Sequence, residues 1–443
     1  MAKYKVYPEY KDSGVEWFDV MPSGWKVTRL KLETIMNMGQ SPSSDDCNIE
    51  GDGLAFLQGN AEFGKINPVE KQYCRVAKKI ANPGELLFSV RAPVGAINFA
   101  DKKYGIGRGL CSIAASAKTR PSFLWWLLPT YKYQLDAIAT GSTFEAVSAE
   151  QLGNLYFALP SIPEQVQIAA FLDHETAKID NLIEKQQQLI ELLKEKRQAV
   201  ISHAVTKGLN PDVPMKDSGV EWLGEVPEHW SIKSYRYACL IYRGKFGHRP
   251  RNDPSLYDGD YPFIQTGDVA RASKFIETYS QTLNEKGKAV SQLFPSGTLM
   301  MAIAANIGDT AILGFEAYAP DSVVGFKPYQ NLHLEFLRYS FMAALPALEQ
   351  TSTQSTQANL NIDRIGAVKA VFPPLEEQLD IVDYLDDMLC SYDSMEENAN
   401  QAIGLLQERR TALISAAVTG KIDVRDWVAP NACEAEASQE VTA

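Results

Sequence analysis

The chain has 443 residues, of which 45% are hydrophobic, and a formal net charge of −12. This length predicts two or three domains with ordinary buried cores. The first residues lack the hydrophobic core of a signal peptide, and the longest apolar runs, such as 123–128, are too short to cross a bilayer. These features exclude secreted and membrane-spanning classes, so we expect a cytoplasmic protein.

The charge is unevenly distributed along the chain. Residues 376–443 include 15 acidic and 4 basic residues, whereas the other 375 residues include 40 acidic and 39 basic residues. The net acidity therefore belongs to the last part of the chain. It does not exclude a nucleic-acid partner for the rest.

In chain order, residues 1–25 form an N-terminal lead-in segment that ends in KDSGVEWFDVMPSGW (11–25). The pattern returns as KDSGVEWLGEVPEHW (216–230), inside a linker and second lead-in segment at 211–231. Nine of the fifteen positions are identical. Such a match predicts that the chain contains two copies of one module.

Each lead-in segment is followed by a body, at 26–160 in the first copy and at 232–373 in the second. Short apolar runs between glycine and proline breaks predict a mixed α and β structure for both bodies. Landmarks recur, such as Phe56-Leu57-Gln58 and Phe263-Ile264-Gln265, but between them the similarity nearly vanishes. We therefore expect the bodies to share a plan and to differ in their surfaces.

Each body is followed by a predicted long helix, at 161–210 and at 374–424. About 43 helical residues in the first would form a rod of roughly 65 Å at 1.5 Å per residue. The two sequences align without a gap, 213 positions apart, and their apolar residues recur in sevens, which predicts a coiled coil between them. The first register contains Leu172, Ile179, Leu193 and Val200, and Leu385, Tyr392, Ala399, Leu406 and Leu413; the second contains Ile168, Leu182 and Leu189, and Ile381, Met388, Met395 and Ala402. The alternative is two unrelated amphipathic helices, each packed on its own domain. The polar, acidic tail at 425–443 is expected to be disordered.

Basic residues cluster within the bodies. Residues 65–120 include 11 basic and 3 acidic residues, and residues 233–251 include 6 basic and no acidic residues with aromatic residues between them. Arg and Lys on loops bind phosphates, and Arg pairs with guanine; a solvated charged surface is the alternative. The candidate DNA-binding residues are Arg75, Lys78, Lys79, Arg91, Lys102, Lys103, Arg108, Arg243, Lys245, His248, Arg249 and Arg251. The segments 140–143 and 351–356 supply hydroxyls that would bind phosphates or, equally well, cap turns.

The sequence lacks recognisable motifs for catalysis and metal binding. It has no phosphate-binding GxxxxGK[ST] loop, no Asp/Asn-Pro-Pro-aromatic tetrapeptide of an amino-methyltransferase and no CxxC pair, and its five histidines are isolated. We therefore predict no catalytic residue and no metal site.

Taken together, the repeated motifs resemble the specificity (S) subunit of Type I restriction-modification enzymes. The resemblance is carried by the two KDSGVEW segments, the helix starts at 160–165 and 372–378, and the helix ends LLKEKRQAVISHAVTKG and LLQERRTALISAAVTGK; it covers about residues 11–425. It implies an α+β fold with two tandem mixed α/β target recognition domains, each followed by a long helix, and an antiparallel coiled coil of the two helices.

The resemblance also implies a function. Each target recognition domain would read one half of a bipartite, asymmetric double-stranded DNA site, and the helix pair would set the spacer and dock two modification subunits. These partners would carry S-adenosylmethionine-dependent adenine methylation, and restriction subunits would use ATP and Mg²⁺, so the S subunit itself would be non-catalytic and without a cofactor. Two alternatives stay open at this point: a coiled-coil scaffold that joins two protein-binding domains, and a stand-alone methyltransferase.

Overall fold

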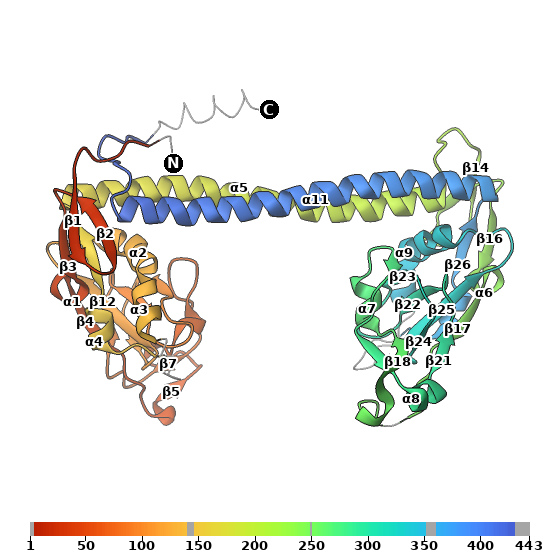
Figure 1. The fold of residues 1–443 in the computed structure, drawn as a ribbon, viewed down its shortest axis with the longest axis horizontal. Coiled ribbons are helices and arrows are strands. Elements are labelled where there is room, and N and C mark those ends of the chain that lie inside the picture. The colour runs from red at the N-terminus through yellow and green to blue at the C-terminus, as the bar shows by residue number, and fades with distance from the viewer. Residues whose placement is uncertain (1–3, 140–145, 249, 351–359, 430–443) are drawn as a thin grey trace. The chain divides into compact units, whose positions relative to one another are not determined.

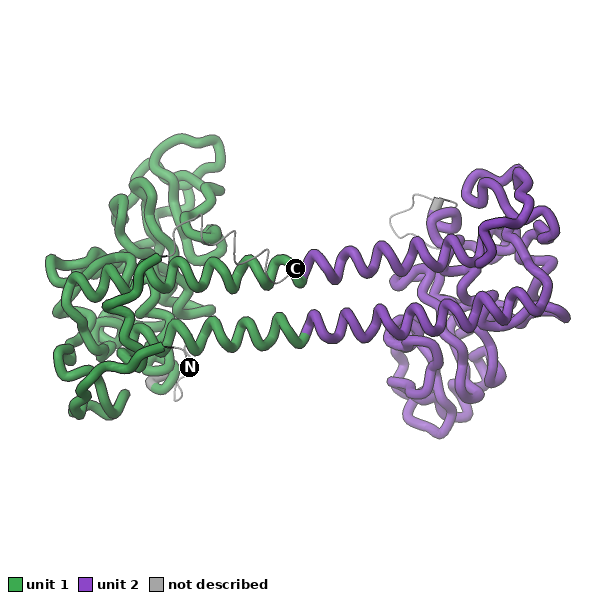
Figure 2. The backbone as a smooth tube through the Cα atoms, turned by 90° about the horizontal axis from the view of Figure 1, so that it is seen from above, with its two compact units in different colours: residues 1–186, 401–443 green, residues 187–400 purple. Residues whose placement is uncertain are grey.

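The computed structural model describes residues 4–139, 146–248, 250–350 and 360–429. The chain divides into two compact units, residues 1–186 with 401–443 and residues 187–400 (Figure 2). The division runs through the middle of both long helices, so each unit contains one body and part of each helix. In the described part of the chain, no helix is long and apolar enough to cross a membrane.

The body of unit 1 is built on two small sheets (Figure 1). The antiparallel one has the order β10 (Ile97–Phe99), β9 (Leu86–Ser89), β12 (Leu110–Ala115) and β4 (Thr34–Met38). The mixed one has the order β5 (Cys47–Asn48), β7 (Tyr73–Cys74), β6 (Leu54–Leu57), β11 (Tyr104–Ile106) and β8 (Ile80–Ala81), with β6 and β11 parallel. The helices are α1 (Leu30–Glu33), α2 (Pro121–Thr130), α3 (Lys132–Ala139) and α4 (Ala149–Gly153), with 3-10 turns η1 (Ser44–Asp46) and η2 (Asn60–Glu62).

The body of unit 2 repeats this plan. One sheet has the order β17 (Cys239–Arg243), β25 (Val323–Pro328), β22 (Leu299–Ala302), β23 (Thr310–Leu313) and β19 (Phe275–Ile276). The other has the order β20 (Gln281–Leu283), β18 (Tyr257–Phe263), β24 (Ala317–Ala319) and β21 (Gln292–Phe294), with β18 and β24 parallel. The helices are α6 (Tyr235–Ala238), α7 (Thr266–Arg271), α8 (Glu285–Val290), α9 (Leu334–Gln350) and α10 (Ile362–Ala367), with the 3-10 turn η3 (Pro254–Leu256).

Each body has a large core that continues into its part of the long helices. In unit 1 this core includes Phe88, Phe123 and Phe157, and it reaches Phe171 and Leu172 on the first long helix. In unit 2 the core reaches Ile381 and Leu385 on the second. Burial of this kind contributes about 25 cal/mol per Å² of apolar surface, so the bodies hold the helices mainly through packing.

The repeated KDSG sequence makes a short Asx turn in each lead-in hairpin, within the first strand in unit 1 and at the end of the first strand in unit 2. The hairpins are β1 (Tyr10–Val15) with β2 (Phe18–Pro22), and β14 (Met215–Asp217) with β15 (Glu225–Pro227). Gly14 and Gly219 have φ values of +71° and +65°, a conformation that favours glycine. The Asp of each turn accepts the glycine N–H, at 2.8 Å for Asp12 and 2.9 Å for Asp217. Backbone geometry therefore explains why the same tetrapeptide occurs in both lead-in segments.

A buried glutamine joins each long helix to its body. A two-stranded sheet leads into each helix: β3 (Lys26–Arg29) pairs with β13 (Tyr156–Leu159), and β16 (Ser231–Ser234) pairs with β26 (Lys369–Phe372). Gln165 then accepts the backbone N–H of Arg120 at 2.8 Å and donates to two carbonyl oxygens, and Gln378 makes the matching three bonds, accepting the N–H of His333 at 2.7 Å. Both side chains are fully buried, where an amide needs all of these partners.

The two long helices predicted from the sequence are present as α5 (Ile162–Lys207) and α11 (Leu375–Val418), packed together (Figures 1 and 2). Within each unit they run antiparallel, and the first predicted register lies in the seam, with Leu172, Ile179, Leu385 and Leu413 buried. The second predicted register is buried near the start of each helix, at Ile168 and Ile381, and is wrong further along. Leu182, Leu189 and Met395 are 46%, 40% and 50% exposed, whereas Ile190 and Leu389 are buried. The partner helix covers the residues four positions after the first register, such as Ile190 and Leu389, rather than the residues three positions after it.

The same ion pair links the helices in each unit. Arg410 Nε lies 2.8 Å from Asp180 Oδ1 in unit 1, and Arg197 pairs with Asp393 in unit 2. Both Arg410 and Asp393 lie 213 positions after their counterparts Arg197 and Asp180. The pairs favour one antiparallel register over its alternatives, as polar contacts do in coiled coils.

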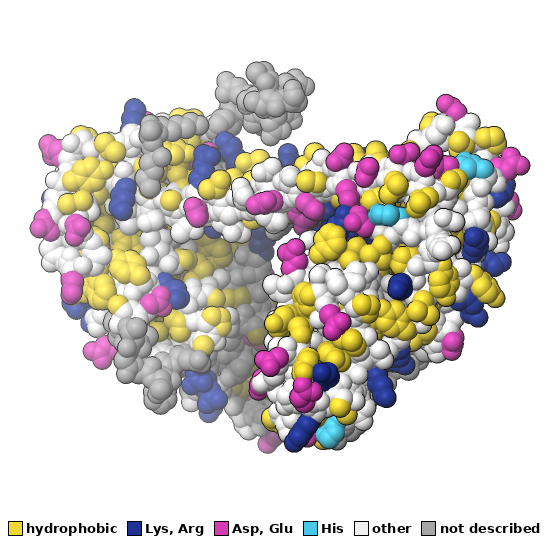
Figure 3. Space-filling view, turned by 45° about the vertical axis from the view of Figure 1, so that its right-hand side comes forward, with side chains coloured by type: hydrophobic (Ala, Val, Ile, Leu, Met, Phe, Trp, Pro, Cys, Tyr) yellow, Lys and Arg dark blue, Asp and Glu magenta, His cyan; other side chains and the backbone are white. Residues whose placement is uncertain are grey.

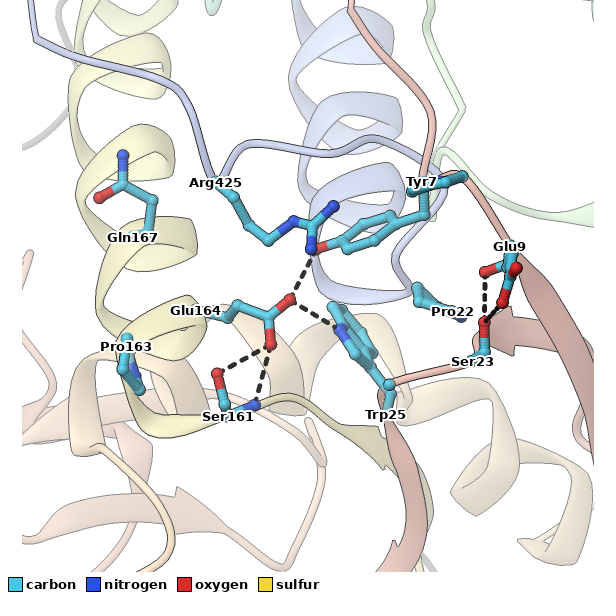
Figure 4. Close-up of a pocket in the computed structure, with 12 residues that line it drawn as sticks. Tyr7, Glu9, Pro22, Ser23, Trp25, Ser161, Pro163, Glu164, Gln167 and Arg425 are labelled. Carbon is cyan, nitrogen blue, oxygen red and sulfur yellow. Dashed lines mark hydrogen bonds between the residues drawn. The ribbon is translucent and has the colours of Figure 1, made fainter.

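A hollow of about 700 Å³ lies in unit 1 at the start of α5 (Figure 4). Glu164 reaches into it, and its Oε1 accepts from Trp25 Nε1 at 3.3 Å and from the Tyr7 hydroxyl at 3.5 Å. Its Oε2 accepts from the Ser161 backbone N–H at 3.2 Å and hydroxyl at 2.8 Å, which caps the helix. Glu377 accepts from Trp230 Nε1 in the same way at 2.9 Å. The shared geometry marks these carboxylates as joints between lead-in segment and helix.

The two ends of the chain meet in unit 1. The backbone N–H of Asp423 bonds the carbonyl oxygen of Lys5 at 2.8 Å, and the hydroxyl of Tyr10 bonds the carbonyl oxygen of Gly420 at 3.0 Å. In unit 2 the corresponding place is occupied by one continuous stretch, residues 208–214, which runs from α5 into β14. Each unit therefore completes the same arrangement, once with two chain segments and once with one.

Candidate nucleic-acid interface

The described charges follow the distribution expected from the sequence. In Figure 3, Asp and Glu side chains gather along the long helices, whereas Lys and Arg side chains are mixed with Asp and Glu over the body of unit 2. Residues 375–400 of α11 include nine acidic residues and no basic residue. A polyanion is repelled by such a helix surface, so the bodies are the candidate interface.

In unit 1 the candidate site forms where the parallel strands β6 and β11 end. Gln58 directly follows β6, Arg108 lies in the turn after β11, and Ser41 lies in the loop after β4. The Ser41 hydroxyl accepts from Gln58 Nε2 at 3.0 Å and from the Arg108 backbone N–H at 3.4 Å. A Cβ atom on Gly39 would lie 2.1 Å from the carbonyl oxygen of Gly107, so only glycine allows these loops to approach.

The other predicted residues of unit 1 are also exposed. Lys79 lies beside the end of β11, where its carbonyl oxygen accepts from the Ile106 N–H at 2.9 Å, and Arg91 follows Val90, which donates to the carbonyl oxygen of Gly109 at 2.9 Å. Arg75 is paired with Asp52 at 2.7 Å, and Lys102 is paired with Glu70. Lys78, Lys79, Lys103 and Arg91 make no ion pair with any residue that the structure describes. Side chains of this kind contact phosphates, which positions a protein on DNA without reading its sequence.

In unit 2 the matching site forms at the ends of the parallel strands β18 and β24. Arg243 Nε donates to the carbonyl oxygen of Asp321 at 2.8 Å, and Arg251 Nη2 lies 2.6 Å from Asp321 Oδ1. A backbone bond to Ala319 at the end of β24 places Lys245 beside them, and Lys245 is exposed. The structure thus brings together three of the five predicted residues of this loop. His248 instead contacts Asp253 at 3.1 Å, and Arg249 lies outside the described residues.

Two adjoining hollows lie beside this cluster in unit 2. The first, of about 490 Å³, is lined by Arg251, Asn252, Gln265 and Gln281 among others. The second, of about 460 Å³, shares Asp258, Gln265 and Gln281 with the first and adds Tyr279. Hydrogen bonds from Ser255 lower the pKa of the Asp253 carboxyl, which caps η3 between two residues that line the first hollow, Asn252 and Pro254.

The sequence reasoning missed the amide side chains at both sites. Gln58 and Gln265 occupy matching positions, and both belong to the landmarks FLQ and FIQ, which were noted as repeats but not as candidates. Glutamine reads base edges in DNA-binding proteins, so an amide in a repeated landmark was an available signal. Gln281 is not repeated in the first body and had no such signal.

Some predictions lie beyond the described residues. The hydroxyl-rich segments 140–143 and 351–356 and most of the tail fall in the ranges 140–145, 351–359 and 430–443, which are not described. Within the described ranges, no group of three or more metal-ligating side chains is present.

The fold and this geometry define a class of protein. It is a tandem-repeat protein with two similar mixed α/β bodies on paired long helices, and each body has a polar site at matching strand ends. The comparison with protein families narrows the class. The family model described as Type I restriction modification DNA specificity domain matches residues 22–192 and again 244–404. The chain belongs to this family and contains two copies of its domain.

Individual relatives agree with this assignment. The chain is 38% identical over 182 residues to the putative type I restriction enzyme MjaX specificity subunit of Methanocaldococcus jannaschii, covering 40% of this chain and 42% of that protein. It is 21% identical over 434 residues to the EcoBI specificity subunit of Escherichia coli, covering 91% of this chain and 87% of that protein. The HsdS subunit of Thermoanaerobacter tengcongensis, at 18% identity and a TM-score of 0.53, covers 91% of this chain and 98% of that one. A chain from a structure of type I restriction-modification complex assembly, also 18% identical, has a TM-score of 0.72 and covers 91% and 99%. These structures share the fold, with two domains and packed long helices.

Proposed function

We propose that this protein is the DNA sequence-recognition subunit of a Type I restriction-modification complex. Each body reads one half of a bipartite, asymmetric site. The observation that carries the proposal is that two bodies with similar sheets, which differ at their edge strands, place different polar side chains at matching strand ends, while the parts that join them are repeated. One scaffold with two different reading surfaces fits an asymmetric site, and the link raises the effective concentration of the second contact.

The partners follow from the same proposal. Two modification subunits dock on the helix pair, and they supply S-adenosylmethionine-dependent adenine methylation; restriction subunits supply ATP- and Mg²⁺-dependent cleavage, all in the cytoplasm. Exposed apolar side chains on the helices support a protein contact there, among them Leu192 at 58% and Leu405 at 67% exposure. This chain carries recognition and no chemistry of its own.

The test is methylome sequencing of a host that expresses the chain with its modification partner. We expect one new bipartite motif with a methylated adenine in each half. A host without any new motif, despite a complex that assembles, would contradict the proposal. The competing hypothesis of a scaffold for two protein-binding domains predicts no salt-dependent retention on DNA, whereas phosphate contacts weaken steeply with salt.

A further inference from the structure

We infer that Gln265 and Gln281 act as one unit that reads an A·T base pair in the major groove, within the half-site of unit 2. The inference rests on the proposed function and adds to it which side chains read a base and which base they accept. It starts from a contact between two amides that line both hollows of this body.

The two amides are bonded to each other. Gln265 Nε2 donates to Gln281 Oε1. The other two polar atoms of the pair then remain for a ligand, Gln265 Oε1 as an acceptor and Gln281 Nε2 as a donor. If both amides are turned over, the donor and the acceptor exchange places, but the pair still presents one of each. An amide pair therefore offers a donor and an acceptor side by side in either orientation.

Only one base has the complementary edge. In the major groove adenine presents the N7 acceptor beside the N6 donor, whereas guanine presents two acceptors and cytosine a donor alone. The Gln265–Gln281 pair matches the adenine edge with two hydrogen bonds, and Tyr279, which is 47% exposed at the same hollow, supplies apolar surface for the thymine methyl group.

The backbone holds both amides in place before DNA binds. Gln281 lies opposite Phe263 in the β18–β20 ladder, and Gln265 follows two residues later at the start of α7. The buried Asp268 accepts the Gln265 backbone N–H at 2.8 Å and pairs with Arg271. Side chains fixed in this way lose little freedom on binding, which favours selectivity.

The charges around the pair favour a base edge over a phosphate. Asp258 lines both hollows and is exposed, so a phosphate there would be repelled. The nearby Arg251 guanidinium is already held by Asp321 at 2.6 Å. In unit 1 the matching Gln58 bonds a serine hydroxyl instead of a second amide, so the inference applies to one half-site only.

The test uses the assembled complex with its modification subunits and the motif found for the unaltered protein. Duplexes carrying each base in turn are compared by competition binding for unaltered protein, Gln265→Ala, Gln281→Ala and the control Gln292→Ala, an amide on the same body outside both hollows. We expect the two hollow variants to lose roughly 10- to 100-fold discrimination at one A·T position of one half-site, and the other half-site and the control to be unchanged. Discrimination that survives in both variants, or a lost position that is G·C, overturns the inference.

Two further arms separate a reading defect from a folding defect. Replacing the adenine by 7-deazaadenine, which lacks N7, should weaken binding by the unaltered protein about 5-fold or more and leave Gln281→Ala binding unchanged. Gln281→Glu removes the donor, so it should raise relative binding to cytosine at that position. If the unaltered complex yields no bipartite motif, the proposed function fails; if it yields one that the hollow variants leave unchanged, only this inference fails.

Discussion

Units 1 and 2 agree in their joints and differ in the surfaces that we propose read DNA. Gln165 and Gln378 make matching sets of three bonds. Glu164 and Glu377 each accept from the tryptophan at the end of their lead-in segment. At the strand ends, by contrast, unit 1 has Gln58 with Ser41, and unit 2 has Gln265 with Gln281 and two arginines on Asp321. A side chain that joins a helix to its body has only one set of partners, whereas a side chain that faces DNA is free to change with the sequence it reads.

The largest effect is expected at the glutamine joints. Gln165→Ala and Gln378→Ala each leave a backbone N–H and two carbonyl oxygens in the core without a partner, so each should lower the free energy of unfolding by about 3 kcal/mol. The measurement is chemical denaturation, with the exposed Gln188→Ala as control, for which we expect less than about 0.5 kcal/mol. Clearly unequal losses in the two variants would break the equivalence of the joints.

A second pair of matching residues should make the stability of the two units depend on pH in different ways. Asp173 and Asp386 lie 213 positions apart on the two helices. Burial raises the pKa of Asp173, which accepts from Trp126 Nε1 at 3.0 Å. Burial also raises the pKa of Asp386, but hydrogen bonds from Lys274 Nζ at 2.7 Å and from Tyr339 more than offset it, so this pKa lies below its ordinary value.

The signs of the two contributions are opposite. Asp386 stabilises the fold above the carboxyl pKa of the unfolded chain, and this stability is lost as the pH falls through its lower folded pKa; Asp173 contributes more as the pH falls, because the fold favours its neutral form. We expect Asp386→Asn to cost about 2 kcal/mol at pH 7 and less at pH 3, and Asp173→Asn to cost nothing at pH 7. Unfolding free energies measured from pH 3 to pH 7 check both, and parallel pH profiles for the two variants would contradict the assignment.

The positioning residues of unit 1 should affect affinity without affecting sequence choice. Lys78→Ala with Lys79→Ala should weaken DNA binding by the complex about 3- to 10-fold and lower the slope of log K against log salt by about one for each phosphate that is no longer bound. Lys178→Ala, on the helix and paired with Glu175 at 3.2 Å, serves as the control. A changed methylation motif with an unchanged salt slope would place these lysines among the base-reading residues instead.

The smallest effect is expected at the interhelical ion pairs. Double-mutant cycles on Asp180 with Arg410 and on Asp393 with Arg197 should give coupling energies of about 0.5 kcal/mol each, because all four side chains are partly exposed. Thermal unfolding at low salt gives the coupling, and 1 M salt should reduce it. A coupling in one unit and none in the other would show that only one pair fixes the register.

The scaffold was predictable from the sequence because its motifs obey local rules. KDSG needs a glycine at positive φ, and the heptads need a partner helix, so both were visible as repeats. The second heptad register was misplaced because Leu182 and Ile183 are both apolar, and only the position of the partner decides which one it covers. Both long helices are therefore present as predicted, while the flank that they bury was misplaced beyond Ile168 and Ile381.

The site was less predictable. Charge density pointed to Arg243, Lys245, Arg251 and Arg108, which do lie at the strand ends, but it included Arg75 and Lys102, which are held in ion pairs elsewhere. Gln281 comes to Gln265 through the pairing of β18 with β20, a contact across 16 positions that no local pattern signals. Amides carry no charge and follow no periodicity, so their role emerges only from the sheet.

The glutamine joint has a consequence for how the gene can change. All six of its bonds end on backbone atoms of Arg120, Lys118, Pro160, His333, Asn331 and Pro373, so no particular side chain is required from the body. Recombination that exchanges one whole body for a foreign one would keep the anchor intact. A body acquired in this way would keep these six bonds, and its apolar side chains would still have to pack on the long helices.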